Sequence, residues 1–244
     1  MVEFKCHRFR KDVPFIKDAD IDLFAEAVIA DYNPKMLTDV ISIDYMHFLE
    51  VYLRLDFQFA DIYFGSNEEP IEGATAFNEG DKLKIFDKAQ MRTDKIVLGR
   101  GSVVLDNTLT ASNMARRQLF TGLHEGGHWM LHQRYYSRNG FQLSFLEPTA
   151  SMMCCRKSGI EGKRELKTNE DFLEHQANMF ASAIAMPKAI ILKVMSSELK
   201  KYQTKTDSAF MLSKMFDVSE IAAKIRLEKL GFFKGSEAVN LLIA

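Results

Sequence analysis

The chain has 244 residues, of which 47% are hydrophobic and 27% charged, and its formal net charge is −1 at pH 7. Such a composition is typical of a globular protein with a sizeable core, and it gives no overall field that favours a nucleic-acid or membrane partner. Charges interrupt the N-terminus too often for a signal peptide, and no run of about 18 apolar residues predicts a membrane span. We therefore expect a cytoplasmic protein with no membrane partner.

The first half of the chain predicts helices followed by a small sheet. Apolar residues recur at helical spacing over 18–32 and again over 43–53. Four later segments are short and strand-like: 55–59, 71–77, 82–86 and 102–105. The stretch Asn78-Glu79-Gly80-Asp81 separates two of them and has the composition of a hairpin turn. We expect these strands to form a mostly antiparallel sheet.

The second half predicts helices interrupted by one long connection. A strongly apolar helix is expected from about 110 to 135, and a second helix over 171–185, where Met186-Pro187 marks its end. The segment 137–169 between them has the composition of a long loop, which in a compact domain is usually functional or disordered. Further helices are expected from 190 onward.

The central motif is His124-Glu125-Gly126-Gly127-His128, an HExxH pattern inside the first of these helices. Residues four apart share one helix face, so the two imidazoles can converge on one metal ion. Glu125 can then reach a water molecule as the catalytic base without binding the metal. The alternative is a pair of core histidines with no metal. Three of the chain's six histidines fall between residues 124 and 132, which favours the metal.

Two adjacent glycines inside a helix are unusual, because each costs about 1 kcal/mol relative to alanine. Gly126 and Gly127 therefore indicate that something approaches this helix closely. We expect a neighbouring strand or a substrate strand there, and the alternative is a locally tolerated weak point of the helix.

The third metal ligand requires a choice. His132 lies one further turn along the helix, too far to share the metal, and is interpreted as a second-shell, substrate-contacting or purely structural residue. Glu174 is the preferred ligand, with Glu170 and His175 as fallbacks. Asn178, one turn beyond Glu174, is expected to accept a hydrogen bond from a ligand histidine and fix its ring.

Two histidines and one carboxylate leave a coordination position open, which is typical of a catalytic zinc site. Mn²⁺, Fe²⁺ or Co²⁺ could occupy such a site as well. The expected chemistry is amide hydrolysis with Glu125 as the base. Four residues are candidate donors to the oxyanion: His132, Arg134, Tyr135 and Tyr136. The three cysteines form no CxxC pair and are expected to be free thiols, with Cys154 or Cys155 as a metal ligand or redox sensor the alternative.

Several segments together resemble the ImmA/IrrE family of zinc metallopeptidases, a gluzincin-like group. The matching segments lie at 71–77, 120–132, 174–181, 185–187 and 216–232. In this resemblance, His124, His128 and Glu174 correspond to the metal ligands and Glu125 to the catalytic base. Gly122-Leu123 and the Gly126-Gly127 pair depart from the family's usual residues, which concerns the substrate pocket rather than the metal.

The resemblance implies a site-specific endopeptidase that cleaves a protein partner, such as a transcriptional repressor or an antitoxin. From the predicted helices and strands we expect an α+β, zincin-like architecture, in which N-terminal helices and a small sheet pack on the HExxH helix. The active-site cleft is expected between the sheet edge and the two ligand helices. We expect a metallopeptidase domain over 1–189 and a C-terminal helical subdomain over 190–244.

Two alternatives remain open. The chain could be a non-cleaving module that uses the same fold to hold a regulator, although such a module has no need of Glu125. It could also bind DNA through the helices of 211–232, where basic side chains are available for phosphates: Lys214, Lys224, Arg226 and Lys229. Acidic residues interleave with them, so a solvated helix face is the preferred interpretation and direct binding to nucleic acid is not expected.

Overall fold

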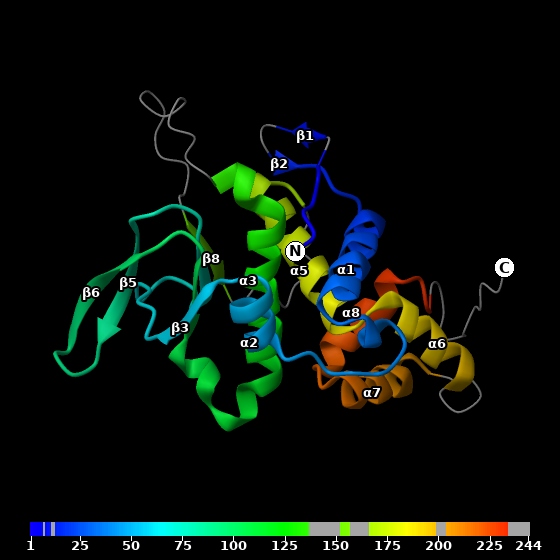
Figure 1. Cartoon of the computed structure of the whole chain (residues 1–244). Coiled ribbons are helices and arrows are strands. Elements are labelled where there is room, and N and C mark those ends of the chain that lie inside the picture. The colour runs from blue at the N-terminus through cyan, green and yellow to red at the C-terminus, as the bar shows by residue number, and fades with distance from the viewer. Residues whose placement is uncertain (7, 11–12, 137–151, 157–165, 199–203, 234–244) are drawn as a thin grey trace.

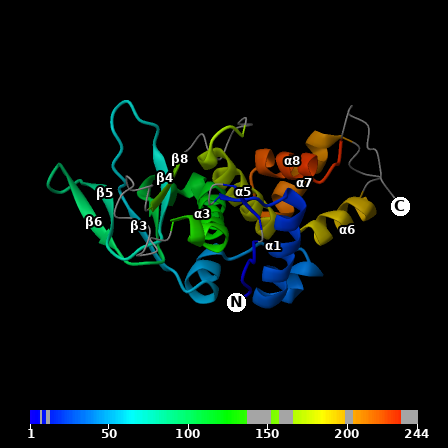
Figure 2. The ribbon, with the colours of Figure 1, turned by 90° about the horizontal axis from the view of Figure 1, so that it is seen from above.

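The computed structural model describes residues 1–6, 8–10, 13–136, 152–156, 166–198 and 204–233. Two long helices, α3 (Ala115–Tyr136) and α5 (Asn169–Ala185), run through the middle of the molecule and pack against each other. The strands β3 to β8, all between residues 56 and 156, lie beyond α3, and the remaining large helices lie on the side of α5 (Figures 1 and 2). The predicted α+β, zincin-like class is confirmed.

The main sheet has the strand order β3 (Asp56–Ala60), β7 (Ser102–Asp106), β4 (Ile71–Ala76), β8 (Met152–Arg156). Only the β3–β7 pair is parallel, so the prediction of a mostly antiparallel sheet is confirmed. Every residue of β4 and β7 is buried, because both strands lie inside the sheet, where α3 contacts them. The predicted loop over 137–169 is wrong at 152–156, where β8 pairs with β4; most of the rest of that segment lies outside the described residues.

The predicted hairpin turn at 78–81 is also wrong. This turn connects β4 to β5 (Asp81–Asp87), but β4 already has β7 on one edge and β8 on the other and cannot pair with β5. Instead β5 forms a separate hairpin with β6 (Arg92–Leu98), which projects from the main sheet (Figures 1 and 2). The sequence analysis missed β6 because its first five residues include no buried position and show little apolar alternation.

The helices of the N-terminal part are α1 (Asp18–Tyr32) and a short α2 (Tyr45–His47) that continues into the π-helical turn η2 (Phe48–Tyr52), as the apolar spacing predicted. Before α1, two strands of two residues each, β1 (Phe9–Arg10) and β2 (Val13–Pro14), pair with each other, and β2 contacts α3 and α5. The helix α3 begins at Ala115 rather than near 110, because two 3₁₀ turns, η3 (Asn107–Thr110) and η4 (Ser112–Met114), precede it.

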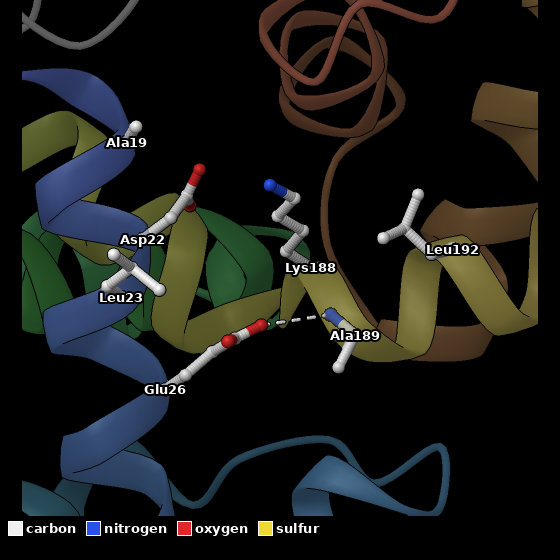
Figure 3. Close-up of a pocket in the computed structure, with 7 residues that line it drawn as sticks. All are labelled: Ala19, Asp22, Leu23, Glu26, Lys188, Ala189 and Leu192. Atoms are coloured by element: carbon white, nitrogen blue, oxygen red, sulfur yellow. Dashed lines mark hydrogen bonds between the residues drawn. The ribbon is translucent and has the colours of Figure 1, made fainter. Parts of the chain in front are cut away.

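The C-terminal helices are α6 (Lys188–Glu198), α7 (Lys205–Phe216) and α8 (Glu220–Lys229). A pocket of about 310 Å³ lies between α1 and α6, where the backbone N–H of Ala189 donates to Glu26 at 3.1 Å (Figure 3). No histidine lines this pocket. Whether the boundary at residue 190 separates two domains stays a prediction. Among the described residues no single helix is long and apolar enough to cross a membrane, and only α5 and α6 taken together as a bent pair reach that length and composition.

The glycine pair of α3 lies against helical elements rather than a strand, which corrects the expectation from the sequence. A Cβ on Gly127 would lie 3.1 Å from the carbonyl oxygen of Ala177 and 3.2 Å from its Cα, so the backbone of α5 passes directly over this glycine. A Cβ on Gly126 would lie 3.0 Å from the Leu49 side chain. Gly127 therefore allows the close approach of α3 and α5 that brings their side chains together.

Candidate metal centre

Three side chains from α3 and α5 converge at the contact between the two helices. His124 and His128 lie one turn apart on α3, and their Nε2 atoms are 2.9 Å apart. Glu174 extends from the second turn of α5. Its Oε2 lies 3.5 Å from His124 Nε2, and its Oε1 lies 3.5 Å from His128 Nε2. A capping box between Thr168 and Asp171 fixes where α5 begins and so where Glu174 stands. One ligand atom from each residue lies within 4.8 Å of the others.

The electrostatics of this group suit a cation. Both histidines are fully buried, and burial lowers the pKa of each to about 3, so both imidazoles are neutral near pH 7. Glu174 is 7% exposed and adds carboxylate oxygens. Neutral imidazole nitrogens and a carboxylate are the donor set of a catalytic zinc site. The residues present therefore fit a divalent metal ion.

Asn178 orients His124 from the same helix that carries Glu174. Its Oδ1 lies 2.9 Å from His124 Nδ1. An amide oxygen only accepts, so the imidazole proton is on Nδ1 and the lone pair of Nε2 faces His128 and Glu174. This contact leaves His124 in the tautomer that can bind a metal through Nε2.

His132 lies outside the three-residue group and contacts His128 instead. Its Nδ1 is 2.9 Å from His128 Nδ1, and its Nε2 is 3.0 Å from Gln176 Oε1. His132 is fully buried, and burial lowers its pKa well below the usual value. This contact of Gln176 was not predicted, because Gln176 is two positions from Glu174 and so does not share a helix face with that ligand.

Glu125 lies at the contact between α3 and β4. Thr75 on β4 donates a hydrogen bond to Glu125 Oε2 at 2.6 Å. Gly73 leaves space for the carboxyl group, because a Cβ there would lie 2.5 Å from Oε1. Oε1 itself is buried with no hydrogen-bond partner among the described residues. Burial raises the pKa of Glu125 to about 8, against the opposing effect of the Thr75 hydrogen bond.

The structure separates the fallback ligands from this group. His175 Nε2 lies 2.7 Å from Asp18 Oδ1 on α1. Glu170 is exposed in the first turn of α5. Neither belongs to the three-residue group. No role at the site was predicted for Thr75, Gly73 or Gln176, because their contacts join segments that are far apart in the chain.

The candidate oxyanion donors have different environments. The Arg134 guanidinium lies 4.2 Å from the centre of the Phe9 ring. The Tyr136 ring is buried and stacks on Phe77, with ring centres 4.6 Å apart. The pKa of Tyr136 is raised, first by burial, next by the neighbouring Tyr135 and then by the charge of Glu174. The Tyr136 hydroxyl therefore stays protonated.

The basic residues of the C-terminal helices do not form one exposed surface. Arg226 is 1% exposed and pairs with Asp22 of α1 at 2.6 Å. Lys229 lies 3.2 Å from Asp18. Lys214 lies over the Phe210 ring at 5.4 Å. Two of the four candidate phosphate contacts therefore pair with carboxylates of α1, which weakens the DNA-binding alternative.

In a comparison with protein-family models, residues 154–228 match the family described as Peptidase_M78, IrrE N-terminal-like domain. The matched segment includes Glu174 and Asn178 on α5 and ends in α8. The HExxH helix lies before it, and the fold brings the two together. The match confirms the resemblance drawn from the sequence motifs. No curated protein matches the chain.

Proposed function

We propose that this chain, as a member of the ImmA/IrrE family, is a zinc-dependent endopeptidase that cleaves a peptide bond in a protein partner in the cytoplasm. The observation that carries the proposal is the buried group of His124, His128 and Glu174 with Glu125 beside it. The family-model match supports a peptidase of this type. The resemblance suggests a transcriptional repressor or an antitoxin as the partner.

His124, His128 and Glu174 would hold the zinc ion, which when bound would polarise the scissile carbonyl and lower the pKa of a water molecule. Beside the positive charge of the ion, the pKa of Glu125 would fall from its metal-free value of about 8. The ionised carboxylate would then accept the proton of the attacking water through Oε1, the oxygen that Thr75 does not contact. Thr75 and Gly73 hold that carboxyl group in place. Tyr136 is our candidate for donating a hydrogen bond to the developing oxyanion, because its hydroxyl stays protonated.

The first test is the metal content of the purified wild-type chain beside Glu174→Ala and Glu125→Gln, measured by elemental analysis. We expect zinc in the wild type, loss of zinc in Glu174→Ala and retention of zinc in Glu125→Gln. A wild-type chain that carries no metal and takes up none on titration would reject the catalytic proposal.

The second test separates a peptidase from a module that holds a regulator without cleaving it. The zinc-loaded chain is incubated with a denatured library of proteome-derived polypeptides, and new termini are identified by mass spectrometry. We expect cleavages that need zinc and that fall by about 10²- to 10⁴-fold in Glu125→Gln, the contribution expected of a positioned base. Equal binding of a protein partner by both chains, with no cleavage by either, would favour the non-cleaving module.

A further inference from the structure

Gln176 connects the N-terminal strand β2 to the histidines of α3. The residue is 3% exposed, and its side chain lies between two polar groups. Its Nε2 donates to the Pro14 carbonyl at 2.7 Å, and its Oε1 lies 3.0 Å from His132 Nε2. A carbonyl oxygen only accepts, so the NH₂ end of the amide must face Pro14. The oxygen end of the amide must therefore face His132.

This orientation determines the next two protons. Because Gln176 Oε1 only accepts, His132 must carry its proton on Nε2, which leaves His132 Nδ1 as an acceptor. His132 Nδ1 lies 2.9 Å from His128 Nδ1, so His128 must donate from Nδ1. The lone pair of His128 Nε2 then faces His124 and Glu174. The hydrogen bonds thus run in one direction from His128 to Pro14.

We propose that Gln176, oriented by the Pro14 carbonyl, is a positioning residue that fixes the tautomers of His132 and His128 and so sets the metal affinity of the site. The inference rests on the proposed function only in taking this group as a metal site, and it does not require that the chain cleave anything. Hydrogen-bond partners of metal ligands fix ring orientation and tautomer, and their loss costs about 10- to 100-fold in metal affinity.

The two ligand histidines are held in different ways. His124 is oriented by one contact, from Asn178 on α5. His128 is oriented through His132 and Gln176, and the last partner is a backbone carbonyl of β2. The pairing of β1 with β2 and the contact of Arg134 with Phe9 hold that strand in place. The metal affinity should therefore depend on the docking of this N-terminal segment through His128.

The direct test is an NMR measurement of imidazole tautomers in the metal-free, ¹⁵N-labelled chain near neutral pH, from two-bond ¹H–¹⁵N correlations. We expect the proton on Nδ1 in His124 and His128 and on Nε2 in His132. Finding the proton of His128 on Nε2 would overturn the proposal without any variant.

Three variants then test the role of Gln176, with the zinc dissociation constant measured by competition with a chromophoric chelator. Gln176→Leu removes the acceptor for His132, so we expect a mixture of tautomers in His132 and His128 and about 10- to 100-fold weaker zinc binding. Gln176→Glu in its protonated form can donate to the Pro14 carbonyl and accept from His132, as Gln176 does, so the wild-type tautomers should persist.

Gln118→Leu is the matched control. Gln118 on α3 also links two partners through its amide, the Tyr45 hydroxyl at 2.8 Å and the Leu109 carbonyl at 3.0 Å, but it contacts none of the histidines. Its loss should lower stability and leave the tautomers and the zinc affinity unchanged. Wild-type tautomers and wild-type zinc affinity in Gln176→Leu would overturn the proposal, and so would an equal loss of affinity in Gln118→Leu.

The outcomes for the two proposals are distinct. Zinc binding with the expected tautomers but without zinc-dependent cleavage would remove the endopeptidase and leave the role of Gln176 supported. Cleavage with unchanged zinc affinity in Gln176→Leu would keep the endopeptidase and reject Gln176. If Gln176→Leu does not fold, the wild-type tautomers and Gln176→Glu still decide the matter, because an Nε2 proton on His128 in either chain rejects the role of Gln176.

Discussion

Two buried polar clusters lie on opposite sides of α5, and only one of them pairs opposite charges within itself. Between α1 and α8, Arg226 is 1% exposed and pairs with Asp22 at 2.6 Å, while its Nε donates to the Met186 carbonyl at 3.2 Å. Between α3 and α5, the Glu174 carboxyl group meets two neutral imidazoles, and that three-residue group contains no lysine or arginine.

The difference shows how a structural cluster can be told from a ligand site. Burying a charge is costly unless an opposite charge or a metal compensates it. The Asp22–Arg226 cluster supplies its own compensation, so its contribution is to stability. The histidine cluster holds atoms that accept rather than donate, so a bound cation would stabilise it. The predictions below test this comparison.

The largest expected effect is acid destabilisation of the metal-free chain. Burial lowers the pKa of His124 and His128 to about 3, whereas unfolded histidines titrate near 6.5. Between these values the unfolded state binds more protons, so stability should fall as the pH drops, by about 1.4 kcal/mol per pH unit for each histidine. Urea unfolding at a series of pH values measures this slope. Bound zinc should add to the free energy of unfolding and so offset the loss of stability.

Glu125 should act in the opposite direction. Burial raises its pKa to about 8 from a reference value of 4.5, so the folded state holds an extra proton between these values. Stability should therefore decline as the pH rises through this range, and the decline should be visible above about pH 7.5, where few histidines are protonated in either state. In Glu125→Gln we expect no decline there. A decline of the same size in the variant would contradict the assignment.

Breaking the self-contained cluster should cost stability and leave the metal site intact. Arg226→Met leaves the Asp22 carboxylate buried without its partner, so we expect a loss of about 3–5 kcal/mol in the free energy of unfolding. Zinc affinity should stay at the wild-type value. Adding Asp22→Leu to Arg226→Met should restore much of the stability, because no uncompensated charge is left. Weaker zinc binding in the single variant would mean that the two clusters are coupled.

Alanine substitutions of the two glycines should have different effects, because Gly127 faces the backbone of α5 and Gly126 faces a side chain. In Gly127→Ala the new methyl group meets the α5 backbone at Ala177, so we expect a loss of about 1–3 kcal/mol and weaker zinc binding as α5 shifts. In Gly126→Ala the methyl group meets the end of Leu49, and the gain in helix propensity of about 1 kcal/mol should offset the cost. Thermal unfolding and zinc titration of both variants provide the comparison.

The smallest effect should come from Thr75→Val. The Thr75 hydrogen bond lowers the pKa of Glu125, so its removal should raise that pKa further, by the equivalent of about 1 kcal/mol. In the metal-free chain, the decline of stability with pH should then extend to higher pH than in the wild type. In the zinc-loaded chain, the pH at which cleavage falls on the acidic side should likewise move to a higher value. An unchanged profile would show that Thr75 has no influence on this carboxyl group.

The sequence alone indicated the parts of the site whose geometry is local. His124, Glu125 and His128 lie within five residues on one helix, so helical spacing was enough to bring the two imidazoles together. Glu174 and Asn178 lie one turn apart on another helix, and this ExxxN spacing was the reason to prefer Glu174 as the third ligand. The α+β class followed from the change of apolar period between the helices and the strands.

Only the tertiary structure decided which segments meet. The turn at 78–81 has hairpin composition, yet both edges of β4 are taken by distant strands, and no local signal records that competition. The glycine pair indicated a close neighbour without telling that it is the backbone of α5. Thr75, Gln176 and Pro14 reach the site from strands or faces far from the motif. Local spacing thus determined the chemistry of this chain, and long-range packing determined what orients that chemistry, because a hydrogen bond between distant segments exists only once the chain has folded.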